Sequence, residues 1–322
     1  MAVPGYRCTG PAGDLTLSGI RGQWWAWPWE LRRAGILSMN ARNRDLIAAL
    51  NPRRFYPRAD DKAVTKEICR TRGIPVPRTY ALIERFGDLG ALAGLLGCRP
   101  TFVVKPARGS GGRGILLITG HRGDRFETAK GEAISLAELR YHLSTTLSGL
   151  YSLGGLPDRA IIEQLIFPHP VFDGLAVEGT PDIRIIVYRG VPVMAMLRLP
   201  TRASRGRANL HQGAAAAGID LATGRTFGGV FRDRATDVHP DTGQRIAGVT
   251  IPHWNLMVET VAKVSDALEL GYVGVDLVLD ADHGPVVMEA NVRPGLAIQI
   301  ANRRGLLPRL READPTLASS PP

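Results

Sequence analysis

The sequence predicts an α+β fold of two or three small lobes that share a core. Its 322 residues are long for one compact domain. A glycine-rich loop at residues 109–114 lies between two predicted strands. Late in the chain, two apolar strands are joined by a short turn and are interrupted by a few polar side chains. A Rossmann fold would need a helix directly after the glycine loop, so these observations argue against it.

The composition is that of a globular protein. Hydrophobic residues make up 44% and charged residues 22% of the chain, which argues against disorder. Its three cysteines are too few and too scattered for a disulfide framework or a zinc site. No apolar run reaches the ~20 residues that cross a bilayer, and no signal-peptide pattern opens the chain. We therefore expect a cytoplasmic protein without a transmembrane segment.

The net charge of +10 invites a nucleic-acid hypothesis. The basic residues are 35 arginines and only 5 lysines, spread along the chain, and no nucleic-acid module is present. We therefore expect no nucleic-acid partner. Because lysine is rare, its positions are informative: Lys62, Lys66 and Lys105 lie within the motifs described below.

The first part of the chain is an extension followed by a small helical lobe. Residues 1–29 are rich in glycine and proline and end in an aromatic run at 24–29. A packing extension or a misassigned start is favoured over docking to a membrane or a partner protein, although tryptophans suit such docking. Residues 30–90 are predicted to form a reduced lobe. Its main helix is capped by Asp60 or Asp61 and runs to about Arg72.

Two further lobes and a tail follow. Residues 91–166 are predicted to form a lid lobe around the glycine loop, and residues 167–310 a C-terminal lobe. Residues 311–322 are polar and Pro/Ser-rich, so we expect them to be disordered. The predicted elements are strands at 101–105, 115–118 and 160–166, a hairpin of 182–188 with 191–199, a helix at 254–268, and strands at 274–279 and 285–290.

The glycine loop predicts a phosphate-binding flap. In the order strand, glycine loop, strand, backbone N–H groups can fold over phosphates, although G-x-G-x-x-G alone is a weak signal. Lys105 ends the strand before the loop, where burying an unpaired ammonium is costly. A phosphate oxygen is the favoured partner. A lysine that reaches solvent at the strand end is the alternative.

The late hairpin predicts a metal site. Alternation puts Glu289 and Asn291 on one face of their strand, and the hairpin can bring Asp276 beside them. Two carboxylates and an amide oxygen suit Mg²⁺ that also binds phosphates. With two ions, Glu289 could bridge them. The alternative is a buried polar network satisfied by Arg184 or Arg198.

Taken together, these residues resemble the ATP-grasp superfamily, and in particular the RimK-type α-L-glutamate ligases. The resemblance spans about residues 30–305. The matching segments are 61–66 (DKAVTK), 73–77 (GIPVP), 102–106 (FVVKP) with the glycine loop, 162–166 (IEQLI), 181–184 (PDIR), 207–213 (RANLHQG) and 288–295 (MEANVRPG). The resemblance implies an ATP-grasp fold with a reduced N-terminal lobe, a glycine-loop lid lobe and a C-terminal metal-binding lobe.

The resemblance also implies cofactors and residue roles. ATP would bind with Mg²⁺, two ions in the fullest form, with Mn²⁺ as a possible substitute. Arg198 and Arg207 would steady the transferring phosphoryl group. Asp276, Glu289 and Asn291 would bind metal, and Arg184 and Arg293 would contact substrate. The residues expected at the nucleotide are Lys62 (with Lys66 as its alternative), Lys105, Gly109, Ser110, Gly111, Gly112, Gly114, Glu163, Gln164, Leu165, Ile166, Asp182 and Asn209.

The implied activity is ADP-forming ligation of a carboxylate to an amine through an acyl phosphate. The substrates would be small molecules or peptides, glutamate or another acidic amino acid among them, and an oligomer is possible. A kinase and a regulatory nucleotide-binding module are the alternatives. Arg293 replaces a small residue of the family pattern, and its planar fork suits an anionic substrate group. Pairing of Arg293 with a protein carboxylate is the alternative.

Overall fold

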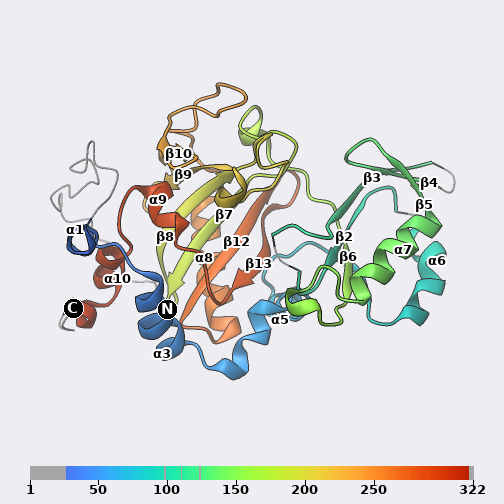
Figure 1. Cartoon of the computed structure of the whole chain (residues 1–322), viewed down its shortest axis with the longest axis horizontal. Helices are drawn as coiled ribbons and strands as arrows, with labels where there is room; N and C mark the ends of the chain where they lie inside the picture. Colours follow the sequence, from blue (N-terminus) through green and yellow to red (C-terminus); the bar gives the residue numbers. More distant parts are fainter. Residues whose placement is uncertain (1–26, 98, 110, 123–124, 319–322) are drawn as a thin grey trace.

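The protein is described by a computed structural model that covers residues 27–97, 99–109, 111–122 and 125–318. It contains two antiparallel sheets, a larger one at the centre of Figure 1 and a smaller one to its right. The first half of the aromatic run at 24–29 falls within residues 1–26, which lie outside the described residues. None of the helices in the described ranges is long and apolar enough to cross a membrane.

The larger sheet has seven strands in the order β11-β10-β9-β8-β7-β12-β13. The predicted hairpin 182–188 with 191–199 is confirmed as β7 and β8, and the late hairpin as β12 and β13. The short strands β9 to β11, which the sequence did not predict, extend the sheet. The bounds are β7 Asp182–Tyr188, β8 Val191–Leu199, β9 Ala215–Ile219, β10 Thr226–Phe231, β11 Arg234–Ala235, β12 Tyr272–Asp280 and β13 Gly284–Asn291.

The smaller sheet has six strands in the order β1-β6-β2-β3-β4-β5 and forms the lid lobe. Leucines of α6 and α7 pack on it to make a separate core, on the side away from the larger sheet in Figure 1. The bounds are β1 Thr79–Ile83, β2 Phe102–Pro106, β3 Leu116–Arg122, β4 Arg125–Thr128, β5 Ala133–Ser135, β6 Ala160–Glu163, α6 Leu92–Leu96 and α7 Leu136–Leu147. Because β1 pairs with β6, this lobe begins about residue 79, earlier than the predicted boundary at 91.

The N-terminal helices have no sheet of their own and share the core of the larger sheet, into which they bury Leu46, Ile47 and Cys69. The predicted cap is confirmed: Asp61 accepts hydrogen bonds from the backbone of Ala63 and Val64 at the start of α5. The bounds are α1 Pro28–Arg33, α2 Met39–Ala41, the π-helix η2 Arg42–Ile47, α3 Ala48–Leu50, η3 Arg53–Phe55, α4 Pro57–Asp60 and α5 Lys62–Thr71.

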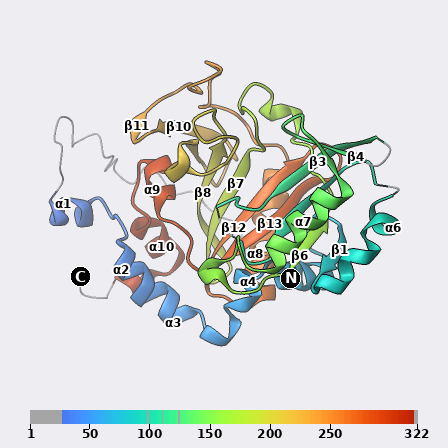
Figure 2. The same cartoon turned by 45° about the vertical axis from the view of Figure 1, so that its right-hand side comes forward.

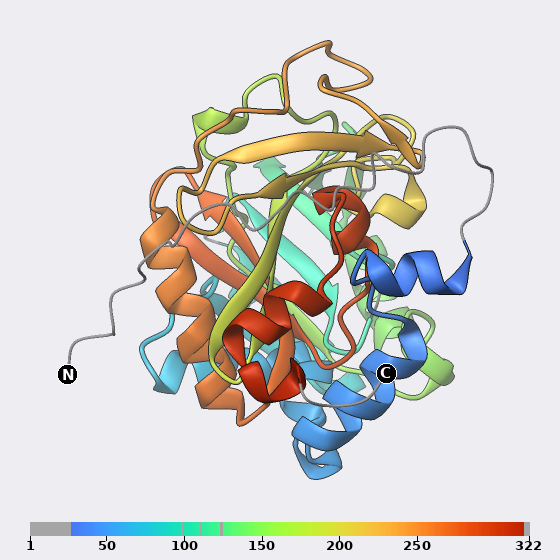
Figure 3. The same cartoon turned by 90° about the vertical axis from the view of Figure 1, so that its left-hand side faces the viewer.

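Three later helices pack beside the larger sheet, as seen in Figures 2 and 3. The helix predicted at 254–268 is confirmed as α8 (Trp254–Leu268), whose buried side includes Met257, Val261 and Val264. The other two are α9 (Ala297–Asn302) and α10 (Leu307–Ala313). Short 3-10 turns complete the fold: η4 Phe86–Ala91, η5 Leu153–Gly155, η6 Pro170–Phe172, η7 Leu210–Gln212 and η8 Pro315–Ala318.

The tail differs from the prediction of disorder for residues 311–322. Helix α10 continues to Ala313, and η8 follows it. The Tyr188 hydroxyl donates to Asp314 Oδ2 (2.8 Å), while Leu310 is buried and Leu317 packs against the core. A few apolar side chains that pack against the core therefore order this segment as far as residue 318, in spite of its polar composition. The last four residues lie outside the described part.

Candidate active site

A cluster of charged side chains lies on four neighbouring strands of the larger sheet. Asp276 on β12 stands opposite Arg184 on β7 and opposite Glu289 on β13. On β8, Arg198 stands opposite Asp182 of β7. Residues opposite each other on adjacent antiparallel strands project from the same face. Strand pairing alone therefore brings the five side chains together.

Two arginines satisfy the carboxylate of Asp276. Arg184 binds it in bidentate geometry, with Nε 2.7 Å from Oδ1 and Nη2 2.6 Å from Oδ2. Arg198 Nη2 lies 2.9 Å from the same Oδ2 and also holds Asp182 with a two-point contact. Asp276 is 3% and Arg198 7% exposed, so these charges depend on one another. Both guanidinium groups thus bind protein carboxylates, and their expected contacts with substrate and phosphate stay predictions.

The network separates the acidities of the buried Asp276 and the partly buried Asp182. Burial raises the pKa of Asp276, but the charges and hydrogen bonds of Arg184 and Arg198 outweigh it and hold that pKa well below its usual range. For Asp182, burial is the largest effect, and the neighbouring Asp276 adds to it. Together they raise the pKa of Asp182 to about 7 despite Arg198. Asp276 therefore stays ionised, as a metal ligand must.

The residues predicted to bind metal converge where β12 and β13 pair. The Asn291 amide nitrogen lies 3.4 Å from Asp276 Oδ2 and 3.4 Å from Glu289 Oε1. An amide can turn to present its oxygen instead. The register shift between Asp276 and Leu277 leaves Met288 as an extra residue on β13. Such a bulge re-aims side chains beside it, here Glu289.

The donor set fits Mg²⁺. Two carboxylates and an amide oxygen are the hard oxygen ligands that this ion prefers. Asp276 is held by arginines, whereas the Glu289 side chain is 31% exposed and its Oε2 lies 3.3 Å from Lys62 Nζ. The arginine-satisfied network left open by the sequence thus accounts for Asp276 but not for Glu289. Glu289 and Asn291 would hold the ion, with Asp276 beside them.

A second buried charge cluster joins helix α5 to the lid sheet. Glu163 on β6 receives Lys105 of β2 at 2.7 Å on Oε1 and Lys66 of α5 at 2.5 Å on Oε2. All three residues are at most 5% exposed. Burial and then the neighbouring Lys105 lower the pKa of Lys66 to about 8. For Glu163 the two lysines outweigh burial and keep its pKa below the usual range. Glu163, expected at the nucleotide, therefore holds the two lysines in place.

Lys62 connects the two lobes at the glycine loop. Its ammonium lies 2.8 Å from the carbonyl oxygen of Gly109 and 3.3 Å from Glu289 Oε2. Its backbone N–H donates to the carbonyl of Ala107. Lys62 is therefore placed between the loop expected to bind phosphates and the strand expected to bind metal. Its neighbour Asp61 binds Arg108 Nε (3.0 Å) and Arg159 Nη2 (2.7 Å) of the lid lobe.

The glycine loop adopts backbone conformations that favour glycine. Gly111, Gly112 and Gly114 have φ values of +64°, +72° and +73°. A Cβ at Gly114 would lie 2.5 Å from the ring of Tyr151, and one at Gly112 would lie 3.6 Å from Arg207 Nε. The tip of the loop therefore meets the Arg207 segment of the C-terminal lobe, which the sequence also assigned to the phosphates. Ser110 lies outside the described residues.

The segment 207–213 is a compact turn. Asn209 starts η7, and its side-chain oxygen accepts a hydrogen bond from the backbone N–H of His211 (3.0 Å). A Cβ at Gly111 would lie 3.1 Å from Gln212 Nε2. Asn209 thus shapes the turn that faces the glycine loop, whereas Gln212 lies closer to the loop and was not singled out from the sequence.

The segment 163–166, expected at the nucleotide, leaves β6 after Glu163. The backbone N–H of Gln164 donates to Arg78 O (2.9 Å), and its side chain accepts from the Arg78 N–H. Because the Gln164 N–H is engaged, the expected backbone contact of Gln164 with the nucleotide would fall to its carbonyl. Leu165 and Ile166 are buried, and Ile166 packs with Val278 and Val286 in a small apolar cluster between the sheets.

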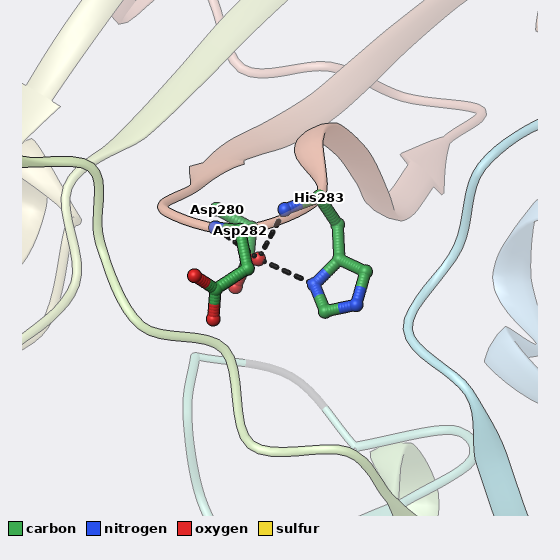
Figure 4. A group of neighbouring side chains, drawn as sticks. All are labelled: Asp280, Asp282 and His283. Atoms are coloured by element: carbon green, nitrogen blue, oxygen red, sulfur yellow. Dashed lines mark hydrogen bonds and ion pairs between the residues drawn. The ribbon is translucent and has the colours of Figure 1, made fainter.

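A turn of the late hairpin supports this segment. Asp280 Oδ1 accepts hydrogen bonds from the N–H groups of Asp282 and His283 and lies 2.7 Å from His283 Nδ1 (Figure 4). Its other oxygen accepts from the N–H of Phe167 (3.1 Å). Asp280, Asp282 and His283 have a spacing that could suit a metal ion. Because Asp280 uses both oxygens on protein partners, it serves here to fix the segment after Ile166.

Arg293 lies at the outer edge of the site. Its guanidinium covers the ring of Tyr56 at 4.9 Å, and its Nη1 is 3.9 Å from Asp60 Oδ2. A different arginine holds the following turn, since Arg42 Nη1 donates to Pro294 O (2.8 Å). The contact of Arg293 with a protein carboxylate, left open by the sequence, is present, but it is long and half-exposed.

Sequence reasoning missed several partners in the site. Asp60 was considered only as a helix cap, and the contacts of Lys66 with Glu163 and of Asp61 with Arg159 were not predicted. The positions of the rare lysines were the available signal for Lys66. The other contacts depend on how the lobes pack, which no local pattern encodes.

A family model described as sugar-transfer associated ATP-grasp matches residues 41–314 of the chain. A protein of Sodalis glossinidius named probable alpha-L-glutamate ligase is 25% identical over 248 residues, which cover 77% of this chain and 61% of that protein. A protein of Maridesulfovibrio salexigens with the same name is 28% identical over 171 residues, or 53% and 42%. The chain thus spans about two to three fifths of the length of these relatives.

Solved structures give weaker likenesses. The D-Ala:D-Ser ligase VanG of Enterococcus faecalis aligns with a TM-score of 0.46 and 13% identity, covering 78% of this chain and 57% of that one. A D-alanine–D-alanine ligase of Bacillus anthracis complexed with ATP aligns with a TM-score of 0.43 and 18% identity, covering 80% and 61%.

Proposed function

Because the chain belongs to the sugar-transfer associated ATP-grasp family, we propose that it is an ADP-forming ligase that joins a carboxylate to an amine. One observation carries the proposal. The ammonium of Lys62 contacts both Gly109 of the glycine loop and Glu289 of the metal strand. A triphosphate held by the loop would therefore lie against the carboxylates that can hold Mg²⁺.

The nucleotide would lie between the two sheets. The base would lie against the apolar cluster of Ile166, Val278 and Val286, on the side of the partly buried Met288. Lys105, fixed by Glu163, supplies a positive charge at the end of β2. The triad of two lysines and one carboxylate carries a net charge of +1 in a buried place, which an anion would compensate. The glycine loop would cover the phosphates and exclude water.

In the reaction, a carboxylate oxygen of the first substrate attacks the γ-phosphorus, and the bond to ADP breaks. The amine of the second substrate then attacks the acyl carbon, phosphate leaves, and the nitrogen loses a proton. Mg²⁺ supplies charge neutralisation at the phosphates. Arg207, next to the glycine-loop tip, is placed to steady the transferring group, and Arg184 and Arg198 keep Asp276 ionised and oriented.

The test is a screen for ADP release with Mg²⁺, amino acids and small peptides, followed by mass measurement of products. We expect one ADP for each product whose mass is the sum of two substrates less one water. A phosphorylated product would instead assign the chain to the kinases. ADP release without an organic product would remove the ligase proposal.

The finer proposal concerns the substrate. The relatives named probable alpha-L-glutamate ligases and the half-exposed guanidinium of Arg293 both favour an acidic amino acid. Arg293→Ala should raise the KM for that substrate by about 10-fold or more and leave the KM for ATP nearly unchanged. Arg309→Ala, which removes a distant surface ion pair with Glu312, is the control. Equal effects on both KM values would exclude the anchor.

A further inference from the structure

Helix α4 places the carboxylate of Asp60 beside Arg293, at the end of strand β13. Asp60 is the last residue of α4, and Lys62, two residues later, contacts Glu289. Arg293 follows Asn291 by two residues at the end of β13. Asp60 Oδ2 lies 3.9 Å from Arg293 Nη1. An acid and a base thus stand next to each other, adjoining the place where the acyl group would react.

The Asp60–Arg293 pair is loose in comparison with the other ion pairs of the site. Its 3.9 Å separation contrasts with 2.6 Å for Arg184 and Asp276, and its side chains are 55% and 51% exposed. Arg293 rests on Tyr56, while the turn at Pro294 is held by Arg42. A long, exposed pair contributes little stability. The fold therefore does not depend on contact between Asp60 and Arg293.

The charge of Asp60 is incompletely compensated. Burial is the largest effect on its pKa and raises it, and this outweighs the lowering by Arg293 and Lys62. The ionised carboxylate is thus less favourable here than in water. A cation that approached to hydrogen-bonding distance would relieve this cost.

We propose that Asp60 and Arg293 form a receptor for an α-amino acid, in which Asp60 binds the ammonium group and Arg293 binds a carboxylate. This inference rests on the proposed ligase function and names the class of one of its substrates. Each protein charge would exchange a partner at 3.9 Å for an oppositely charged substrate group in direct contact. Asp60 then determines that the substrate carries a free amine, and Arg293 determines that it is an anion.

The test is calorimetric binding to the full chain loaded with Mg²⁺ and the ATP analogue AMPPNP. The probes are L-glutamate and glutarate, which has the same two carboxylates but no amino group. The wild type should prefer L-glutamate by at least about 10-fold. Asp60→Asn should abolish that preference and leave glutarate binding within about 3-fold, while Arg293→Ala should weaken both probes. Asp45→Asn, in an exposed pair with Arg44, is the matched control.

Asp60→Asn removes a carboxylate that is unfavourably ionised, so the variant is expected to fold, and its unfolding curve checks this. A retained preference for L-glutamate in Asp60→Asn, or an equal loss for both probes, would overturn the receptor. So would a wild type that binds neither probe while it releases ADP with other acids, which would leave the ligase proposal standing. Absence of ADP release with every acid would count against the ligase function itself.

Discussion

The charges of the candidate site differ in how firmly they are held. Asp276 and Glu163 each receive two cations at short distances and are almost completely buried. Among the described residues, Glu289 has a single, longer ion pair, with Lys62, and is partly exposed. Buried charges with several partners orient their neighbours, whereas a carboxylate with free coordination sites can still take a ligand. Glu289 is therefore the residue where the metal hypothesis is tested most directly.

Glu289→Gln should lower Mg-ATP turnover by at least about 100-fold while the fold remains intact. The change removes a ligand charge and keeps the shape of the side chain. Its contact with Lys62 is partly exposed, so the loss in stability should be at most about 1 kcal/mol. Steady-state kinetics and urea unfolding measure the two effects. Glu269→Gln, which breaks a surface pair with Arg58, is the control. Turnover within a few-fold of wild type would remove the metal site.

The lowered pKa of Lys66 predicts that ATP use depends on pH. With a pKa of about 8, its ammonium loses a proton as the pH rises through that value, and the net charge of the triad falls from +1 to zero. We expect kcat/KM for ATP to decline above about pH 8. Lys66→Met should flatten this limb, and it leaves Glu163 and Lys105 as a neutral pair that can stay buried. Lys130→Met is the exposed control. If kcat/KM for ATP still declines above about pH 8 in Lys66→Met, the decline arises from another group.

The sequence predicted the metal-binding residues of β12 and β13 better than the triad of Lys66, Lys105 and Glu163. Alternation and a short turn suffice to bring Asp276, Glu289 and Asn291 together. The contact of Lys66 with Glu163 joins a helix of one lobe to a strand of another, and no periodicity reports such a contact. The burial of Arg198 between two carboxylates was likewise beyond local patterns.

Among the secondary-structure elements, the glycine loop depends most closely on its neighbours. His142 of α7 lies 3.0 Å from Gly114 O, and Gly109 forms a bridge with Ser152. Tyr151 packs where a side chain at Gly114 would stand. Both ends of the loop are thus held by one segment of the lid lobe, and its tip faces the C-terminal lobe.

Gly114→Ala should destabilise the protein by about 1–3 kcal/mol and raise the KM for ATP by about 10-fold or more. Both a φ of +73° and the Tyr151 ring oppose a Cβ there. Gly131→Ala is a matched control, because its φ is +79° and nothing lies within 4 Å of the added atom. Melting temperature and ATP kinetics of the two variants separate backbone strain from the clash. Equal effects in both variants would show that the Tyr151 contact is unimportant.

The predicted elements that agree best with the structure are those with strong alternation or length. The hairpin of β7 and β8 and the helix α8 have the predicted bounds. Strand β9 is made mostly of alanines, whose weak strand preference gives little signal. In the lid lobe, β4 and β5 have only four and three residues. Short elements of this kind are fixed by the sheet that they join.

For the whole molecule, we expect nucleotide and metal to stabilise the fold together. Mg²⁺ with AMPPNP at 100 times its Kd should add about 2.7 kcal/mol to the free energy of unfolding. Thermal unfolding with and without EDTA measures this, and chelation should remove part of the shift. Glu289→Gln should lose the part that depends on the metal. An unchanged melting temperature with Mg²⁺ and AMPPNP would contradict nucleotide binding between the sheets.

Helix α5 joins the lid lobe to β13 of the larger sheet, and this has a mechanical consequence. Asp61 binds Arg108 and Arg159, the Lys62 backbone binds Ala107, and Lys66 binds Glu163 one turn later, so the bonds between α5 and the lid lobe are gathered near one point, within the first two turns of the helix. A rotation of the lid lobe about that point would preserve these bonds. The displacement would grow with distance from the pivot and be largest at β4 and β5. A pair of fluorescent labels on β5 and α8 would therefore report a small angular swing as a large change in distance.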